Sequence, residues 1–210
     1  MLIDETMELG KSNGFDKDHA VAVSKLSLLL FDEFQALHRM GNSERIWLRI
    51  ASLLHDVGKS VSGAFHHKAS RDIIVKKADL PFRKRVRKMI GLVARYHRGE
   101  LPRDTHKYYR RLDGESKQCV RKLAALIRLA DALDAEHKQF VSSLSCTIRK
   151  DCVILYILTR DETDLRKVAR KADFFEQTYD RKIEIRTVVA SRLRNLKLDS
   201  NPARVYSRVA

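Results

Sequence analysis

The chain has 210 residues, of which 44% are hydrophobic and 33% charged, enough for one fair-sized domain or a domain with an appendage. No apolar run approaches the ~20 residues that span a bilayer, and the start of the chain is acidic, so we expect neither a membrane helix nor a secretory leader. The three cysteines show no C-x-x-C spacing, which argues against disulfides and a thiolate zinc site. A cytoplasmic protein is expected.

The net charge of +15 is concentrated in two segments. Residues 76–111 hold thirteen Lys and Arg against three acidic residues, and residues 192–208 hold five against one. Such segments indicate a polyanionic ligand, which can be nucleic acid, polyphosphate or a phosphorylated nucleotide. A solvated basic face without a specific ligand is the alternative.

Amphipathic periodicity indicates a mainly helical fold up to about residue 140. Residues 1–15 lack a clear period and are expected to form a short leader. Apolar side chains then recur every three or four positions. The sequence predicts helices over residues 16–40, 43–54, 66–78, 82–97 and 115–138.

The stretch from His55 to Lys59 places an imidazole, a carboxylate, a glycine and a cation within five residues. It follows directly on an amphipathic helix, so we expect His55 and Asp56 on its last turn. Gly58 suits the left-handed conformation that ends a helix. The chain would then turn and direct both side chains to a shared ion. We interpret this stretch as half of a metal site.

Three further polar side chains fall on core-facing stripes, namely His19, His97 and Asp131. A histidine facing the core is either a satisfied core residue or a ligand. A carboxylate facing the core costs several kcal/mol unless it is paired or bound to a metal. For Asp131 the alternative to a ligand role is an ion pair with Arg128 or Lys122.

Beyond residue 140 the pattern becomes that of strands. Residues 144–148, 153–159 and 182–189 alternate or are β-branched, with a helix expected over 161–179. From residue 191 the chain is polar and basic, as in a flexible arm. We therefore divide the chain into a helical metal-binding domain (1–140), a small α+β appendage of three strands and one helix (141–190), and a basic tail (191–210).

The order His, His-Asp, Asp along a helical chain resembles the HD superfamily of metal-dependent phosphohydrolases over residues 17–137. The run Leu-Leu-His-Asp-Val-Gly-Lys at 53–59 is close to its usual signature. The resemblance implies an HD-type helical bundle in which His19, His55, Asp56 and Asp131 bind one divalent ion.

Some members of this superfamily bind a second ion through two added histidines, with the aspartate of the HD pair bridging both ions. His67 and His97 stand where these histidines would lie, so a binuclear site is expected. The choice between His66 and His67 remains open, because Ala69 replaces a further histidine of many relatives.

A closer resemblance is to the C-terminal region of the exopolyphosphatase/guanosine pentaphosphate phosphohydrolase (Ppx/GppA) family, and extends to about Ile185. It is carried by His-His-Lys at 66–68, Ala-Arg-Tyr-His-Arg at 94–98 and Arg-Lys-Leu-Ala-Ala-Leu-Ile-Arg-Leu-Ala-Asp-Ala-Leu-Asp at 121–134. In that family the phosphatase site lies in actin-like N-terminal domains with glycine-rich loops. The eight glycines of this chain are never closer than four positions apart, so no such loop can cradle a phosphate.

These observations predict an enzyme that hydrolyses a phosphoester or phosphoanhydride by metal-activated water. Asp56 and Lys59 are the expected catalytic residues. Imidazole and oxygen ligands suit one or two ions of Mn, Fe, Zn, Ni or Co, or Mg with added waters. The residues expected to hold phosphate oxygens are Lys59, Lys68, Arg95 and Arg98.

A binding module is the competing hypothesis. The helical domain would then grip polyphosphate or RNA without catalysis, or regulate a separate actin-like Ppx/GppA-type catalytic subunit. The expected partners are a phosphate-containing small molecule or polyphosphate, with nucleic acid and a homodimer as further options and no membrane.

Overall fold

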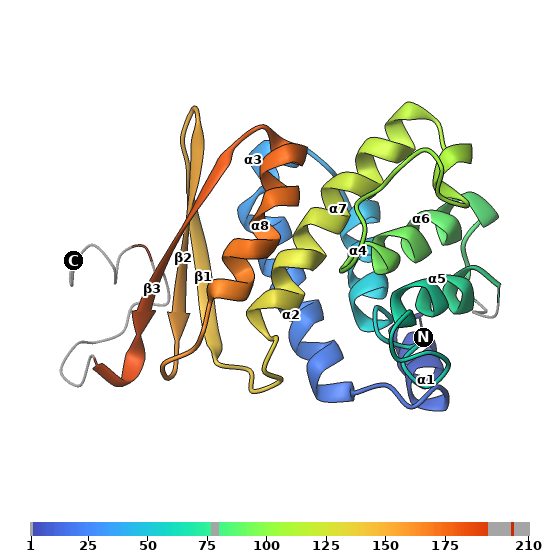
Figure 1. The fold of residues 1–210 in the computed structure, drawn as a ribbon, viewed down its shortest axis with the longest axis horizontal. Coiled ribbons are helices and arrows are strands. Elements are labelled where there is room, and N and C mark those ends of the chain that lie inside the picture. Colours follow the sequence, from blue (N-terminus) through green and yellow to red (C-terminus); the bar gives the residue numbers. More distant parts are fainter. Residues whose placement is uncertain (1, 77–79, 193–202, 204–210) are drawn as a thin grey trace.

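The computed structural model describes residues 2–76, 80–192 and 203 of the chain. The described helices are α1 Leu2–Ser12, α2 Lys17–Glu33, α3 Gln35–His38, α4 Asn42–Leu53, α5 His66–Lys76, α6 Lys84–Arg95, α7 Gly114–Leu133 and α8 Arg166–Tyr179, with 3₁₀ turns at Tyr109–Arg111 and Ala190–Arg192. The strands are β1 Val141–Ile148, β2 Cys152–Thr159 and β3 Lys182–Val189. Figure 1 shows the sheet at one end of the molecule, with α8 and α2 between it and the other helices. The mainly helical fold with a small α+β part is confirmed.

The three strands are ordered β1-β2-β3. β1 and β2 form an antiparallel hairpin, whereas β3 returns parallel to β2 after the crossover helix α8, as a parallel connection requires. Phe174 and Phe175 of α8 are fully buried and belong to the same hydrophobic cluster as the core of the bundle. The core therefore continues from the helices into the appendage, and α8 is held firmly against α7.

Two sequence predictions near the N-terminus are wrong. The expected leader is helix α1, which packs Leu2 and Leu9 against the core. The expected long helix 16–40 breaks at Phe34, a fully buried residue whose backbone leaves the helical region. Arg39 then takes a left-handed conformation that ends the short helix α3.

Other boundaries differ by a few residues, as expected where helix ends depend on tertiary contacts. α7 ends at Leu133 and α8 begins only at Arg166. The end of the helix predicted to reach Ala78 and nearly all of the basic tail lie outside the described residues. Within the part of the chain that the structure describes, no helix has the length and apolar character needed to cross a bilayer.

Candidate metal centre

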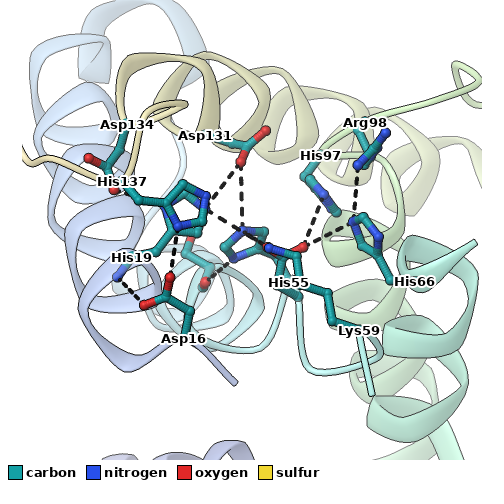
Figure 2. A network of polar contacts seen from close by, with 12 residues as sticks. Asp16, His19, His55, Lys59, His66, His97, Arg98, Asp131, Asp134 and His137 are labelled. Atoms are coloured by element: carbon teal, nitrogen blue, oxygen red, sulfur yellow. Dashed lines mark hydrogen bonds and ion pairs between the residues drawn. The ribbon is translucent and has the colours of Figure 1, made fainter. Parts of the chain in front are cut away.

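Six metal-capable side chains from five parts of the bundle converge at one place. They are His19 in the first turn of α2, His55 and Asp56 after α4, His66 at the start of α5, His97 after α6 and Asp131 in α7. The four imidazoles are almost fully buried. Figure 2 shows them side by side, with Asp131 next to His19 and His55, Lys59 below the middle of the group, and Arg98 beside His66 at the other end.

Gly58 holds α5 against the turn that carries His55 and Asp56. A Cβ atom at this position would lie 2.4 Å from the backbone nitrogen of Ser70 and 2.5 Å from the carbonyl oxygen of His66. The Gly58 N–H also donates to Ser70 Oγ at 2.9 Å. Its backbone is not left-handed, so that prediction was wrong: glycine is required here for close approach, which brings His66 to Asp56.

The two carboxylate oxygens of Asp56 face two different groups of nitrogen atoms. Oδ1 lies 3.1 Å from His66 Nε2 and 3.5 Å from His97 Nε2. Oδ2 lies 3.4 Å from His55 Nε2, 3.9 Å from His19 Nε2 and 2.5 Å from Lys59 Nζ. Asp56 is thus the residue that joins both groups.

The opposite ring nitrogens fix the orientation of these imidazoles. His55, His66 and His97 each place Nδ1 at 2.7 Å from the carbonyl oxygen three residues earlier. A carbonyl oxygen only accepts hydrogen bonds, so Nδ1 carries the hydrogen. In the neutral imidazole, Nε2 then directs a lone pair to the centre. His19 Nδ1 lies 2.8 Å from Asp134 Oδ2, the carboxylate–histidine arrangement that orients metal ligands.

This donor set fits a divalent cation. The Nε2 atom of neutral His97 and the carboxylate oxygens carry lone pairs, which repel unless positive charge lies between them. His55 Nε2 and Asp56 Oδ1 are buried without a well-formed hydrogen bond among the described residues, which is rare for buried polar atoms. Ligand atoms of two residue groups also lie within 4.8 Å of one another: His19, His55 and Asp131, and His55, Asp56 and His97.

The pKa values show how strongly these groups interact. Burial would raise the pKa of Asp56, yet His55, His66 and His97 hold it well below its ordinary value. Burial would lower the pKa of His19, but hydrogen bonds to Asp131 and Asp134 raise it to about 9. Burial and the neighbouring His55 lower the pKa of His97 to about 3, so His97 is neutral and its Nε2 is free to bind a cation.

Asp131 uses its two oxygens differently. Oδ1 lies 3.4 Å from His19 Nε2 and 3.7 Å from His55 Nε2, while Oδ2 pairs with Lys171 Nζ of α8. The two cations considered from the sequence as partners of Asp131, Arg128 and Lys122, form other contacts. Arg128 donates to the carbonyl oxygens of Tyr96 and Gly99, and Lys122 donates to that of His38. Nothing in the local pattern of residues 161–179 indicated Lys171.

A cavity of about 430 Å³ opens over these side chains. Its cationic lining comprises Lys59, Arg98, Arg128, Lys167 and Lys171. Of the residues expected to hold phosphate, Lys59 and Arg98 thus line the cavity. Arg95 and Lys68 do not: Arg95 is buried near Glu100, at 3.9 Å, and Lys68 lies over the ring of Phe65.

The structure brings His66, and not His67, to the cluster. The ring of His67 lies beside Gly99 and is not among the residues that line the cavity. Burial and the neighbouring His66, together with nearby cations, lower its pKa to about 4. The sequence indicated His67 and left the choice between the two histidines open. The geometry favours His66, which occupies the first position of α5, and the ligand role itself stays a prediction.

Two further residues, both in contact with His19, were not singled out from the sequence. Asp134 follows Asp131 by three positions, and this i, i+3 spacing on one helix face could have indicated it. His137 stacks on His19 with ring centroids 3.8 Å apart, and its Nδ1 lies 2.7 Å from Asp16 Oδ2. Asp16 also accepts the backbone N–H of His19 and so caps α2.

Comparison with known proteins places the chain in a family. The family model described as Ppx/GppA phosphatase, domain III, matches residues 5–181, which is most of the chain and includes nearly all of the bundle and the appendage up to the start of β3. The protein therefore belongs to this Ppx/GppA family and is related to phosphatases. A search with the sequence found no match among curated proteins.

Proposed function

We propose that the protein is an HD-type, metal-dependent phosphohydrolase with a binuclear site. The observation that carries this proposal is that the two carboxylate oxygens of Asp56 face different pairs of histidines. Oδ2 faces His19 and His55. Oδ1 faces His66 and His97. A carboxylate between two sets of lone-pair donors is what a bridge between two cations requires. Asp131 would complete the set of ligands that contains His19 and His55. Family membership supports phosphate chemistry.

Bound divalent ions would supply an acidified water as nucleophile and would neutralise charge on a phosphoryl group. Cationic side chains of the cavity can bind the phosphate group in such a reaction. Lys59 and Arg98 line it and can hold non-bridging phosphate oxygens. Arg128 faces the same space, anchored by backbone carbonyl groups. The substrate is thus a phosphoester or phosphoanhydride of a nucleotide or another polyanion.

Metal analysis and a substrate screen test this proposal. Purified protein, loaded with Mn²⁺ and dialysed, should retain two ions per chain and hydrolyse at least one member of a panel of phosphodiesters, nucleotides and polyphosphates. His55→Ala should lose both ions and activity, whereas Lys150→Ala, in the turn before β2, should keep both. Hydrolysis that survives in an ion-free His55→Ala protein would refute the assignment.

A second function is favoured by the cationic lining of the cavity. The chain would then bind polyphosphate or RNA without hydrolysing it, or serve a separate catalytic subunit. Added salt should weaken such binding steeply. Turnover at a metal centre should instead respond chiefly to chelators, so the two treatments separate the hypotheses.

A further inference from the structure

The appendage contributes two cations to the cavity that the bundle forms. Lys167 and Lys171 are four positions apart on α8, so they lie on one face of this helix. Both line the cavity together with the metal-capable residues. The buried side chains of α8, including Val168, Phe174 and Phe175, fix the helix against the rest of the protein. The backbone that carries the two lysines is therefore held in place beside the cavity.

Lys171 also determines how Asp131 can act. Its ammonium group pairs with Oδ2, and only Oδ1 faces His19 and His55. Asp131 can then offer one oxygen to a cation, while the other is satisfied by the appendage. Removal of Lys171 would free Oδ2 and loosen the orientation of the carboxylate.

The lining of the cavity defines what part of a ligand fits inside it. Apart from Gly99 and Ala135, every described residue that lines it is charged or is a histidine. Five cationic side chains face two carboxylates, and no Phe, Tyr or Trp ring among these lining residues could stack on a base. A volume of about 430 Å³ is within the range of small-molecule sites. The cavity thus suits a group with several negative charges.

On these grounds, and resting on the proposed function, we propose that Lys167 and Lys171 are substrate-binding residues of the site. They bind a phosphate group that is linked to the attacked phosphate group, while Lys59 and Arg98 hold the attacked phosphate group itself. The site accordingly prefers compounds with two linked phosphates over those with one, and the α+β appendage is a working part of the active site.

Binding of two phosphonates tests this inference without depending on turnover. Methylenediphosphonate has two linked phosphonate groups and resists hydrolysis, and methylphosphonate has one. Isothermal titration calorimetry in excess Mg²⁺ should show tighter binding of the diphosphonate to the wild-type protein. In Lys167→Ala/Lys171→Ala this affinity should fall on the order of ten- to a hundred-fold, as for lost charge-assisted hydrogen bonds. Methylphosphonate should lose less than about threefold.

Arg170→Ala is the matched control, since Arg170 is an exposed cation of the same helix that does not line the cavity. It should bind both phosphonates like the wild type. Lys167→Ala, at an exposed position, should fold normally and still lose part of the diphosphonate affinity. Circular dichroism checks the folding of each variant. Unchanged diphosphonate affinity in the double variant, or an equal loss for both phosphonates, would overturn the inference.

Failure of the proposed function would look different. In that case the lysine-dependent preference for the diphosphonate would persist while the substrate screen gave no hydrolysis. If hydrolysis is found, the double variant should raise KM for a nucleoside diphosphate more than it lowers kcat. Lys171→Arg, which keeps the cation beside Asp131, should recover part of the loss; no recovery would count against the positioning role of Lys171.

Discussion

The imidazoles of the bundle and the lysines of the appendage reach the same cavity in different ways. His55, His66 and His97 are each oriented by a carbonyl oxygen three residues earlier in the chain. Lys167 and Lys171 owe their position to the packing of α8 against α7. Local structure therefore orients the imidazoles of the site, whereas tertiary packing places its lysines.

Asp56→Asn should have the largest effect, because it removes the charge that both nitrogen groups share. We expect loss of both ions and a fall in activity well beyond the 10–100-fold that an outer-shell change costs. Metal content by mass spectrometry and turnover measure this. The helix content should stay near that of the wild type. Two ions retained by the variant would contradict the bridging role.

His66→Ala, compared with His67→Ala, tests directly which of the two histidines binds an ion. We expect the first variant to bind one ion in place of two, since Asp56 Oδ1 would keep only His97 as a neighbour. The second should bind two, because His67 does not line the cavity. Ion stoichiometry by titration with Mn²⁺ distinguishes them. Equal stoichiometries would return the choice between the two histidines to an open question.

Asp134→Asn should weaken ion binding less, because Asp134 contacts an imidazole and no ion. Its Oδ2 lies 2.8 Å from His19 Nδ1, and loss of such a partner typically costs about 10- to 100-fold in metal affinity. Competition with a chelator of known affinity measures the change. Asp32→Asn, at an exposed carboxylate of the same protein that pairs with Arg45, should leave ion affinity unchanged.

Gly58→Ala should lower the free energy of unfolding by about 1–3 kcal/mol, the usual cost of overpacking. The added Cβ would lie 2.4 Å from Ser70 N, so α5 must shift and His66 with it. Gly114→Ala is the control, because a Cβ there meets nothing within 4 Å, and it should be neutral or stabilise by up to about 1 kcal/mol. Urea unfolding compares the two; equal stability would show that the close approach is not needed.

The sequence was informative where a histidine or a carboxylate interrupts an apolar helix face. His19, His97 and Asp131 stood out because burial of a polar group requires a partner, and the structure brings all three together with His55 and Asp56. The strands were predicted within a few residues, since alternation and β-branched residues are local signals.

The failures have a common cause in contacts between distant segments. The choice between His66 and His67 depends on how α5 rests on Gly58, which no periodicity reveals. Arg95 and Arg98 both flank His97, yet only the second lines the cavity, because the first lies on the buried side of the helix end. The break at Phe34 likewise follows from packing.

The sequence by itself determined a helical chain with an α+β end and most of the metal-capable side chains, because helix period and buried polar residues are properties of short stretches. Only the tertiary structure decided which histidine of the pair faces Asp56, that Asp134 supports His19, and that Lys171 pairs with Asp131. These are contacts between residues as far as 115 positions apart. Their formation depends on how whole helices pack, and that packing is set by the shared core.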